Sequence, residues 1–383
     1  MMRWSRTLVI GLAVVAYGLV FGEVFLRLFA PEPLVPRYVT GGSDGIRANL
    51  PNVAFRQWTP EVDVVVRYNE RGMRDDRPAP ALRKRPGECR VALVGDSYFV
   101  GFESDFAGSF GKRLEDRLAA AKTPVRVLDF AVSGFGTAED LIVIKRRVAA
   151  WQPDVVIMSW HASDPVDNVR SGLFRVEGGR LVATGEAFLP GVAVSDRLML
   201  MPGYRWLIEN SHLYSAVRER AGVATKALLA DVRGKMHEAS PGDADKGDTA
   251  VASMPARPVD AGSPQLDLAL LMAARDASHA MGAQFLLFDI PIRSDRTTFV
   301  SPQALYLGAL PGIDSVSPFA DFKAAARPDR KLYQEHGQLH WTTEGNARAA
   351  AVAAADIGQR GWLRGCGDAA ARTKSFEIAA AAP

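Results

Sequence analysis

The stretch Arg90-Val91-Ala92-Leu93-Val94-Gly95-Asp96-Ser97 decides how the rest of the chain is organised. Its apolar, β-branched run has the length of a buried strand and ends abruptly in Gly-Asp-Ser. In open α/β sheets, sites form in the crevice outside the carboxyl ends of the strands. Ser97 is therefore a candidate nucleophile. The alternative is a turn serine that caps the following helix, and the motif alone does not separate the two.

After this stretch the chain alternates apolar runs with amphipathic ones. Short strands are expected at 90–95, 125–130, 154–160, 284–290 and 313–316. Helices are expected at 109–121, at 138–151 with Thr137 as N-cap, at 265–281, and in an Ala-rich segment ending near Gln359. This alternation predicts an α/β fold, with a parallel sheet covered by helices on both faces.

Composition divides the chain into four segments. Residues 1–30 hold an apolar helix, 31–88 an irregular lead-in, 89–366 the α/β domain, and 367–383 a loose Ala-rich tail. The lead-in carries one alternating run at 62–68, which predicts an edge strand or hairpin. An insertion at about 169–263 is expected to cap the sheet edge, with a hairpin at 174–182, a helix at 204–229 and a disordered run at 238–263.

A second serine motif lies in the lead-in. Gly41-Gly42-Ser43-Asp44-Gly45 formally matches the G-x-S-x-G elbow. That elbow needs a strand before it and a helix after it. Here proline-rich coil precedes the motif and further coil follows it, so we interpret the match as chance.

The amino-terminal segment predicts a membrane helix. Residues 8–26 are apolar apart from Glu23, and about 20 such residues span a bilayer. Arg3 and Arg6 precede the run, which by the positive-inside rule keeps the amino terminus in the cytoplasm. We expect an uncleaved signal anchor in a bacterial inner membrane, single-pass, with the domain facing the periplasm. A cleaved signal peptide and a buried core helix are the alternatives.

Charge and cysteine content exclude several classes of protein. The net charge is +3 and no Lys/Arg cluster with interleaved aromatic residues occurs, so nucleic-acid binding has no electrostatic footprint. Two cysteines provide neither a disulfide framework nor a cysteine metal site. Cys89 directly precedes the first strand and Cys366 follows the last helix, which places both at one end of the sheet. An oxidising periplasm would permit a disulfide between them.

Four loops carry the candidate chemistry. Three follow strands and contain Ser97, Ser133-Gly134 and Ser163-Asp164, and the fourth precedes the last helix and contains His340. A serine becomes nucleophilic when a histidine base takes its proton, and an acyl transition state needs donors for its oxyanion. Ser97 and His340 supply the first pair, and the N–H groups of Ser97 and Gly134 supply two donors.

These blocks resemble those of the SGNH, or GDSL, hydrolase superfamily, and in particular its membrane-anchored bacterial members. The resemblance implies a three-layer, flavodoxin-like fold and serine-dependent ester chemistry without a metal or cofactor. It rests on the following segments: Gly95-Asp96-Ser97, Val132-Ser133-Gly134-Phe135-Gly136, Ser163-Asp164-Pro165-Val166-Asp167-Asn168, His340-Trp341-Thr342-Thr343-Glu344-Gly345 and the lead-in Asn69-Glu70-Arg71-Gly72-Met73-Arg74.

Two departures from the family pattern bear on catalysis. Ser163 stands where the family has an asparagine oxyanion donor, and loss of one such donor typically costs about 10²–10³ in rate. The family's aspartate before the histidine is also missing, and Gly337 or Gln338 stands in its place. Gln338 could orient the ring without charge, and Glu335 is a substitute acid from a neighbouring position. Asp96 and Asp164 are further candidates for support of the site.

Two functions follow. The first is a serine esterase or O-acyltransferase acting on an acyl ester of an envelope glycan or lipid. The second is a catalytically weakened module that binds an acylated glycan, or a partner in a polymer-export assembly. Ser97, Gly134 and His340 favour the enzyme. Two other observations on histidines carry less weight. His161 is expected to be a rim residue without a chemical role. His336 and His340 have the i, i+4 spacing that binds metal on a helix, but Gly337 argues against a helix there, so no metal site is expected.

Overall fold

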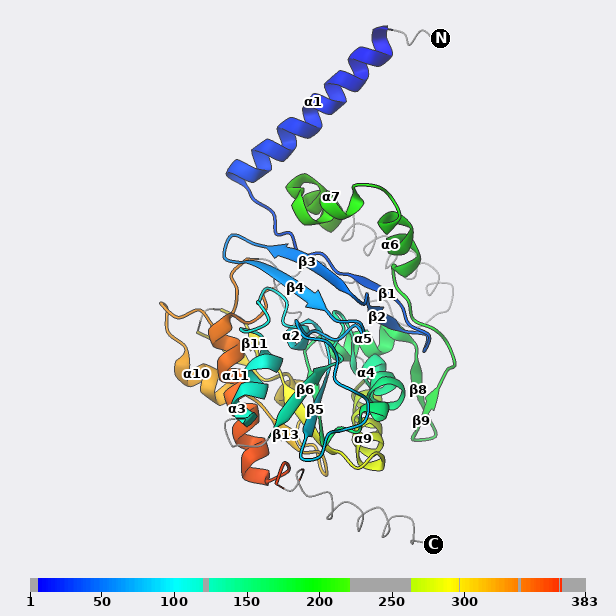
Figure 1. The fold of residues 1–383 in the computed structure, drawn as a ribbon, viewed down its shortest axis with the longest axis vertical. Helices are drawn as coiled ribbons and strands as arrows, with labels where there is room; N and C mark the ends of the chain where they lie inside the picture. The colour runs from blue at the N-terminus through cyan, green and yellow to red at the C-terminus, as the bar shows by residue number, and fades with distance from the viewer. Residues whose placement is uncertain are drawn as a thin grey trace, which may run out of the picture.

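A computed structural model describes residues 6–119, 124–220, 263–295, 297–336, 339–364 and 366 (Figure 1). Its centre is a five-stranded sheet in the order β13-β10-β7-β5-β6, in which every neighbouring pair is parallel. The bounds of these strands are Cys89–Val94 for β5, Val125–Asp129 for β6, Val155–Trp160 for β7, Gln284–Asp289 for β10 and Ser315–Val316 for β13. The expected strands are therefore present and form one sheet.

Strand β5 shows why the sheet is covered on both faces. All of its residues are buried, and their side chains alternate between two hydrophobic clusters. Val91 and Leu93 belong to one cluster, whereas Ala92 and Val94 belong to the other. A strand that is apolar on both faces is stable only between two layers, because each face must be removed from water.

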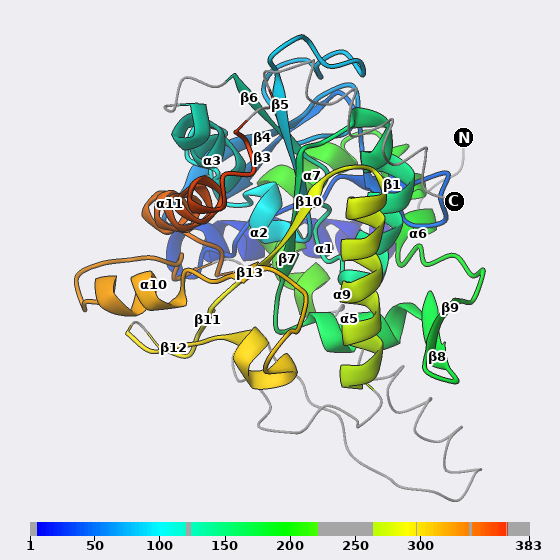
Figure 2. The same ribbon diagram turned by 90° about the horizontal axis from the view of Figure 1, so that it is seen from below.

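The helices supply these two layers. Figure 2 shows α3 and α11 on one side of the strands and α9 on the other. The first layer consists of α3 (Phe110–Ala119), α11 (Thr343–Arg360) and α10 (Phe319–Ala325). The second consists of α4 (Thr137–Val143), α5 (Asp164–Ser171) and α9 (Ser263–Ala280). The protein thus has the three-layer α/β architecture that the sequence predicts.

The lead-in forms two small antiparallel sheets of its own. Strands β1 (Val39–Gly41) and β2 (Arg47–Asn49) pair with each other, and β3 (Val53–Trp58) pairs with β4 (Asp63–Tyr68). Of the two expectations for residues 62–68, the hairpin is therefore the one found. Alternate residues of β3 are buried and join the first hydrophobic cluster, which attaches the hairpin to the domain.

The insertion differs in part from the expectation. Strands β8 (Phe174–Glu177) and β9 (Arg180–Ala183) form the predicted hairpin, and α6 (Val192–Met199) follows them. The single helix expected at 204–229 is wrong, because α7 (Tyr204–Asn210) ends at Ser211, whose backbone is extended. A new helix begins at His212 and is described to residue 220. The runs at 238–262 and 367–383 lie outside the described residues.

The helix expected at 138–151 also has a different construction. Gly136 is the N-cap of α4, and Glu139 bonds back to its N–H group, so Thr137 is the first helical residue rather than the cap. A π-helical turn, Ile144–Val148, and a 3₁₀ turn, Ala149–Trp151, continue it. The remaining short elements are β11 (Ile292–Arg293), β12 (Phe299–Val300) and a π-turn at Gln303–Leu307.

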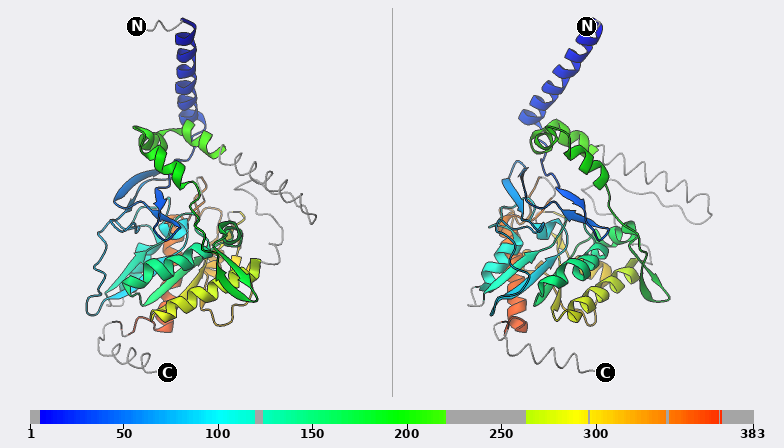
Figure 3. Two further views of the ribbon diagram at one scale, coloured as in Figure 1. Left: turned by 90° about the vertical axis from the view of Figure 1, so that its right-hand side faces the viewer. Right: turned by 45° about the vertical axis from the view of Figure 1, so that its right-hand side comes forward.

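An apolar helix and a disulfide lie at opposite ends of the molecule. Helix α1 (Arg6–Phe29) extends away from the domain (Figure 3), and among the described residues it is the one helix long and apolar enough to cross a membrane. At the opposite end, Cys89 and Cys366 are joined by a disulfide with a Cα–Cα distance of 5.3 Å. The bond joins the start of β5 to the segment after α11.

Candidate active site

Ser97 lies where β5 leaves the sheet and is the first residue of the short helix α2 (Ser97–Val100). Gly95 allows this exit, because a Cβ atom at that position would lie 1.9 Å from the Oγ of Ser159 in β7. Asp96 is the N-cap of α2 and accepts a hydrogen bond from the Tyr98 N–H at 3.0 Å. Asp96 therefore fixes the turn that presents Ser97, and Ser97 itself is not the capping residue.

His340 faces Ser97 from the segment just before α11. Its Nε2 atom lies 2.7 Å from the Ser97 Oγ. Tyr98 and Phe102 pack edge-on against its ring, at centroid distances of 5.2 and 5.8 Å. These contacts leave His340 only 3% exposed, so its ring orientation is set by packing. The structure thus brings together two residues that are far apart in the sequence and that the sequence predicts as a pair.

Glu103 lies on the other side of the His340 ring. Its Oε2 atom is 2.9 Å from Nδ1 and also accepts the backbone N–H of His340 at 3.3 Å. The carboxyl group is buried, with the residue 1% exposed. A buried carboxylate is costly unless it is paired, and here the imidazole and the amide supply that pairing. Ser97, His340 and Glu103 therefore form a continuous hydrogen-bonded chain.

The backbone of Glu103 is held in an unusual conformation. Gly101 ends α2 in the left-handed region, and Glu103 itself has φ of 60°. A non-glycine residue in this region costs about 1–3 kcal/mol and persists only where its surroundings impose the conformation. Gln57 of β3 accepts the Glu103 N–H at 2.8 Å, and Gln334 donates to its carbonyl at 3.4 Å. The lead-in hairpin thus contributes directly to the position of the acid.

The lead-in motif also fixes the residue that follows Glu103. Arg74, which is 3% exposed, donates to the Ser104 carbonyl at 3.2 Å, and Asn346 of α11 donates to the Ser104 Oγ at 2.9 Å. Asn69 shapes the turn before Arg74 by accepting the N–H groups of Arg71 and Met73. The Asn-x-x-Gly-x-Arg segment therefore positions the loop that carries the acid.

Glu103 was not among the residues that the sequence pointed to. The position before His340 suggested Gln338 or Glu335 instead. Gln338 lies outside the described residues, and the Glu335 carboxylate is 2.9 Å from the Nζ of Lys331. The carboxyl group on Nδ1 of His340 is that of Glu103, which corrects the expectation that a neighbour of His340 holds the ring.

The glycine loop after β6 runs beside the segment that leads into Ser97, because the Val132 N–H donates to the Gly95 carbonyl at 2.9 Å. Gly134 has φ of 76°, a conformation that favours glycine, and its carbonyl accepts a hydrogen bond from Arg47 at 2.7 Å. A Cβ atom there would lie 3.4 Å from Nη2 of Arg47 and 3.7 Å from Nη1 of Arg37. Within the described part of the chain, the N–H groups of Ser97 and Gly134 make no hydrogen bond to another backbone group. Both are available as donors.

The loop after β7 carries Ser163 and His161. The Ser163 N–H donates to Nδ1 of His161 at 3.3 Å, and the Ser163 Oγ lies 3.1 Å from the same atom. Burial lowers the pKa of His161, so the ring is neutral, and because Nδ1 accepts, its proton lies on Nε2. The Ser163 hydroxyl also hydrogen-bonds with Asp167. An oxyanion role for Ser163 stays a prediction.

His161 lies where β7 leaves the sheet. Near the end of β7, the Ser159 Oγ accepts the N–H of Asp96, in the segment that follows β5, at 3.4 Å. His161 directly follows Trp160, the last residue of β7. Its ring centroid is 5.3 Å from that of Tyr98, the residue that also packs against His340. His161 is partly exposed, which is compatible with the rim position expected from the sequence, and its ring contact with Tyr98 places it beside the site.

The acidic residues of this loop hold its shape. Asp164 accepts the His161 N–H at 2.9 Å, and Asp167 pairs with Arg170 at 2.6 Å. Asn168 accepts the Ala138 N–H at 2.9 Å and donates to Asp267 at 2.7 Å. Burial raises the pKa of Asp164 well above its usual value. Through these contacts, Asp164, Asp167 and Asn168 hold the conformation of the loop after β7.

Among the described residues, no group of side chains with metal-ligand spacing lies at this site. Within the described ranges, one group of side chains has metal-ligand spacing: Cys89, Asp154 and Cys366. Its two sulfur atoms are already bonded to each other. His336 lies 3.5 Å from Glu61 and His340 contacts Ser97 and Glu103, so the two histidines serve different partners.

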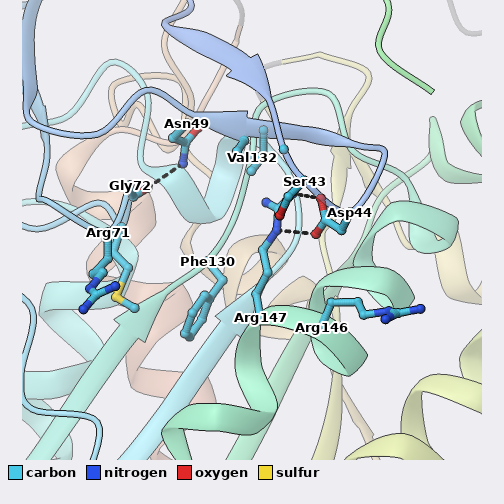
Figure 4. Close-up of a pocket in the computed structure, with 12 residues that line it drawn as sticks. Ser43, Asp44, Asn49, Arg71, Gly72, Phe130, Val132, Arg146 and Arg147 are labelled. Atoms are coloured by element: carbon cyan, nitrogen blue, oxygen red, sulfur yellow. Dashed lines mark hydrogen bonds and ion pairs between the residues drawn. The ribbon is translucent and has the colours of Figure 1, made fainter. Parts of the chain in front are cut away.

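A separate cavity of about 410 Å³ lies beside the β1–β2 turn (Figure 4). Ser43 of the formal G-x-S-x-G match lines it, and the adjacent Asp44 makes two hydrogen bonds with Arg147, at 2.7 and 2.8 Å. Neither Ser97, Glu103 nor His340 lines this cavity. Ser43 also lies in a turn between two short strands and has no helix after it, so it does not have the geometry of a nucleophile elbow.

Comparison with known proteins finds similar solved structures at low identity. No family model matches the chain, and no curated protein sequence matches it. The crystal structure of TesA is similar over 70% of this chain and 97% of its own, with 13% identity and a TM-score of 0.35. A lipase/acylhydrolase from Enterococcus faecalis is similar over 71% of this chain and 96% of its own, with 12% identity and a TM-score of 0.36.

A third similar structure is a two-domain esterase, CEX, described as active on acetylated mannans. It matches 73% of this chain and 50% of its own, with 10% identity and a TM-score of 0.37. Likeness at this level carries no information about which reaction this chain catalyses. The chain nevertheless combines a three-layer α/β fold with four blocks, in order, that resemble those of the SGNH, or GDSL, hydrolases.

Proposed function

We propose that this protein is an SGNH-type serine hydrolase acting on ester bonds, with Ser97 as nucleophile, His340 as general base and Glu103 as the acid that orients it. The observation that carries the proposal is the hydrogen-bonded chain from Ser97 Oγ through both ring nitrogens of His340 to Glu103. Three side chains in this order are the arrangement that activates a serine, and they are recognised by geometry rather than by sequence position.

The reaction would proceed through an acyl-enzyme. The Ser97 Oγ attacks the ester carbonyl while its proton passes to Nε2 of His340, and Glu103 stabilises the resulting imidazolium. The N–H groups of Ser97 and Gly134 donate to the oxyanion of the tetrahedral intermediate. His340 then returns the proton to the departing alkoxide, and the acyl group remains on Ser97. An incoming hydroxyl group then attacks the acyl carbonyl while His340 accepts its proton, and His340 returns this proton to the departing Ser97 Oγ, which regenerates the serine.

A third oxyanion donor is available although the family's asparagine is absent. The neutral His161 ring carries its proton on Nε2, and the ring lies against Tyr98 beside the site. Within the described structure, Nε2 of His161 has no hydrogen-bond partner, so its proton is not committed elsewhere. We assign His161 rather than the Ser163 hydroxyl as the third donor.

The expected substrate is an acyl ester of an envelope glycan or lipid. Two features support a location in the cell envelope. The apolar helix α1 fits a membrane anchor, and the Cys89–Cys366 disulfide fits a domain in an oxidising compartment. Transfer to a sugar hydroxyl, instead of hydrolysis, would use the same residues, because only the acceptor of the acyl group differs.

The alternative of a weakened binding module loses its main support. It depended on the absence of an acid beside His340, and Glu103 occupies that place at 2.9 Å. What remains of it is the missing asparagine at position 163.

Covalent labelling with a fluorophosphonate tests the proposal. The full chain in detergent should form one adduct, located on Ser97 by peptide mass spectrometry, and Ser97→Ala should abolish it. Ser43→Ala is the matched control, because Ser43 lies in the other serine motif and should label like the wild type. Labelling that persists in Ser97→Ala, or the absence of an adduct on a folded wild type, would exclude the serine enzyme and favour the binding module.

A further inference from the structure

Glu23 connects the apolar helix to the insertion. Its carboxylate accepts hydrogen bonds from the Ser211 Oγ at 2.7 Å and from the N–H groups of His212 and Leu213 at 3.1 and 2.9 Å. Arg27 pairs with the same carboxylate at 2.6 Å. Glu23 therefore satisfies the first amides of the helix that begins at His212, as an N-capping group would.

Further contacts make this junction rigid. His212 lies 2.8 Å from the Glu32 carbonyl through Nδ1 and packs edge-on against Trp58 at 4.9 Å. Ser215 donates to the Pro33 carbonyl at 2.6 Å. The last turns of α1, the start of the following helix and β3 are thus joined, and Figure 1 shows α7 near the foot of α1, with α6 beside α7.

The length of α1 determines how deep this junction lies. The apolar run before Glu23, residues 8–22, is about 22 Å long at a rise of about 1.5 Å per residue. The hydrocarbon core of a bilayer is about 30 Å thick, so that run alone does not cross it. The full candidate span, Leu8–Phe29, is long enough, but it includes Glu23 and its ion-pair partner Arg27. Glu23 lies six residues, about 9 Å, before the end of that span, so a complete span brings the Glu23 junction close to the headgroup layer.

The elements next to the junction expose large apolar side chains. Leu200 is 84% exposed and Trp206 is 63% exposed, and both lie where α6 leads into α7. We define the juxtamembrane face as the exposed apolar residues Val194, Leu200, Met201, Trp206 and Val217. Apolar residues with an exposed tryptophan are typical of segments that lie in the interfacial layer of a membrane.

We propose that the juxtamembrane face is a membrane-binding surface, inserted in the headgroup layer of the bilayer that holds α1. This inference rests on the proposed membrane anchor and extends it from a single tether to a two-part attachment. The occupant is the lipid surface, because the face adjoins the point where α1 leaves the bilayer. The attachment would hold the domain in one orientation, since Glu23 couples α1 to the insertion.

Cysteine labelling in lipid vesicles tests this surface. Because Cys89 and Cys366 are bonded to each other, Trp206→Cys introduces the one free thiol of the chain. The full-length variant carries an environment-sensitive fluorophore and is reconstituted in vesicles of neutral and anionic phospholipid with nitroxide-labelled lipids. Leu19→Cys reports on the anchor and Leu305→Cys, which is 53% exposed on the domain, is the matched solvent control.

The expected result is a blue-shifted emission and quenching by the nitroxide lipids at positions 206 and 19, and neither at position 305. If position 19 is quenched but position 206 behaves like position 305, the anchor stands and the juxtamembrane face is not a lipid surface. Protection of position 206 from both lipid and aqueous quenchers means that protein covers the face, which also overturns the proposal. Absence of quenching at position 19 overturns the anchor itself.

Discussion

Glu103 and His340 form the contact that defines the site: the Glu103 Oε2 atom lies 2.9 Å from Nδ1 of His340 and accepts its backbone N–H as well. One carboxylate thus fixes both the ring and the main chain of the base. The hydrogen bond also sets the tautomer, because a proton held on Nδ1 leaves Nε2 free to accept the proton of Ser97.

Gln57→Leu should lower kcat without a comparable change in KM. The substitution removes the acceptor of the Glu103 N–H and leaves a buried donor without a partner, at a cost of about 1–3 kcal/mol in stability. Gln334→Leu is the matched control, because its contact with the Glu103 carbonyl is longer, at 3.4 Å, and should matter less. Steady-state kinetics on an activated acyl ester and thermal unfolding measure both effects. If Gln57→Leu and the wild type have equal kinetics, the lead-in hairpin does not position Glu103 for catalysis.

His161→Ala should reduce kcat by about 10²–10³, the usual loss for one oxyanion donor. Ser163→Ala should cost much less, because its backbone N–H still donates to Nδ1 of His161 and keeps the proton on Nε2. The same ester assay compares the two variants at a pH where the wild type is fully active. A larger loss for Ser163→Ala than for His161→Ala would make the hydroxyl the donor, as the sequence suggested.

Glu139 should make the fold less stable as the pH rises. Burial raises its pKa to about 7 from 4.5, although the Gly136 amide and Arg47 oppose that shift. Below about pH 4.5 the carboxyl group is protonated in both states, so the stability it contributes is complete there. Between pH 4.5 and 7 the unfolded chain ionises first, and the free energy of unfolding falls by at most about 3 kcal/mol.

Thermal unfolding at pH 5 and pH 8 measures this loss. Glu139→Gln should narrow the difference in melting temperature between the two pH values, because an amide does not titrate. Glu186→Gln, at an exposed position, should behave like the wild type. A Glu139→Gln variant with the full wild-type pH dependence would show that the buried carboxyl group is not its source.

Reduction of the disulfide should destabilise the domain by about 2–5 kcal/mol. Cys89 and Cys366 close a loop with a sequence separation of 277, and a cross-link of that length restricts the unfolded chain strongly. Thermal unfolding with and without dithiothreitol should show a lower melting temperature for the reduced wild type. The double variant Cys89→Ala, Cys366→Ala is the control, and its melting temperature should not respond to the reductant. A wild type isolated with two free thiols would contradict the pairing.

Several site residues were accessible to sequence reasoning because local patterns determine them. Ser97 follows a short buried strand. Gly134 lies in the loop after the next strand, where the backbone is left-handed and favours glycine. His340 precedes a capped helix, where Thr342 accepts the Gly345 N–H. Each of these signals lies within a few residues of the group that it predicts, so the chain order of strands and loops was sufficient.

Glu103 was not accessible in this way. Its place depends on a left-handed turn at a non-glycine residue and on contacts from Gln57, Arg74 and Gln334, which belong to three separate segments. No spacing rule links these residues, and the family pattern directed attention to the residues just before His340. The break between α7 and the next helix was missed for a similar reason, because Glu23 of a distant helix supplies the cap at Ser211.

The rate of fluorophosphonate labelling at Ser97 in two glutamate variants tests whether Glu103 is the acid that orients His340. Glu103→Gln preserves shape but removes the charge beside His340, and such a change in a serine triad lowers the rate by about 10⁴. Glu335→Gln is the matched variant at the position that the sequence suggested. We expect a large loss of labelling rate for Glu103→Gln and a near-wild-type rate for Glu335→Gln. A wild-type rate for a folded Glu103→Gln, or a loss confined to Glu335→Gln, would contradict this role of Glu103.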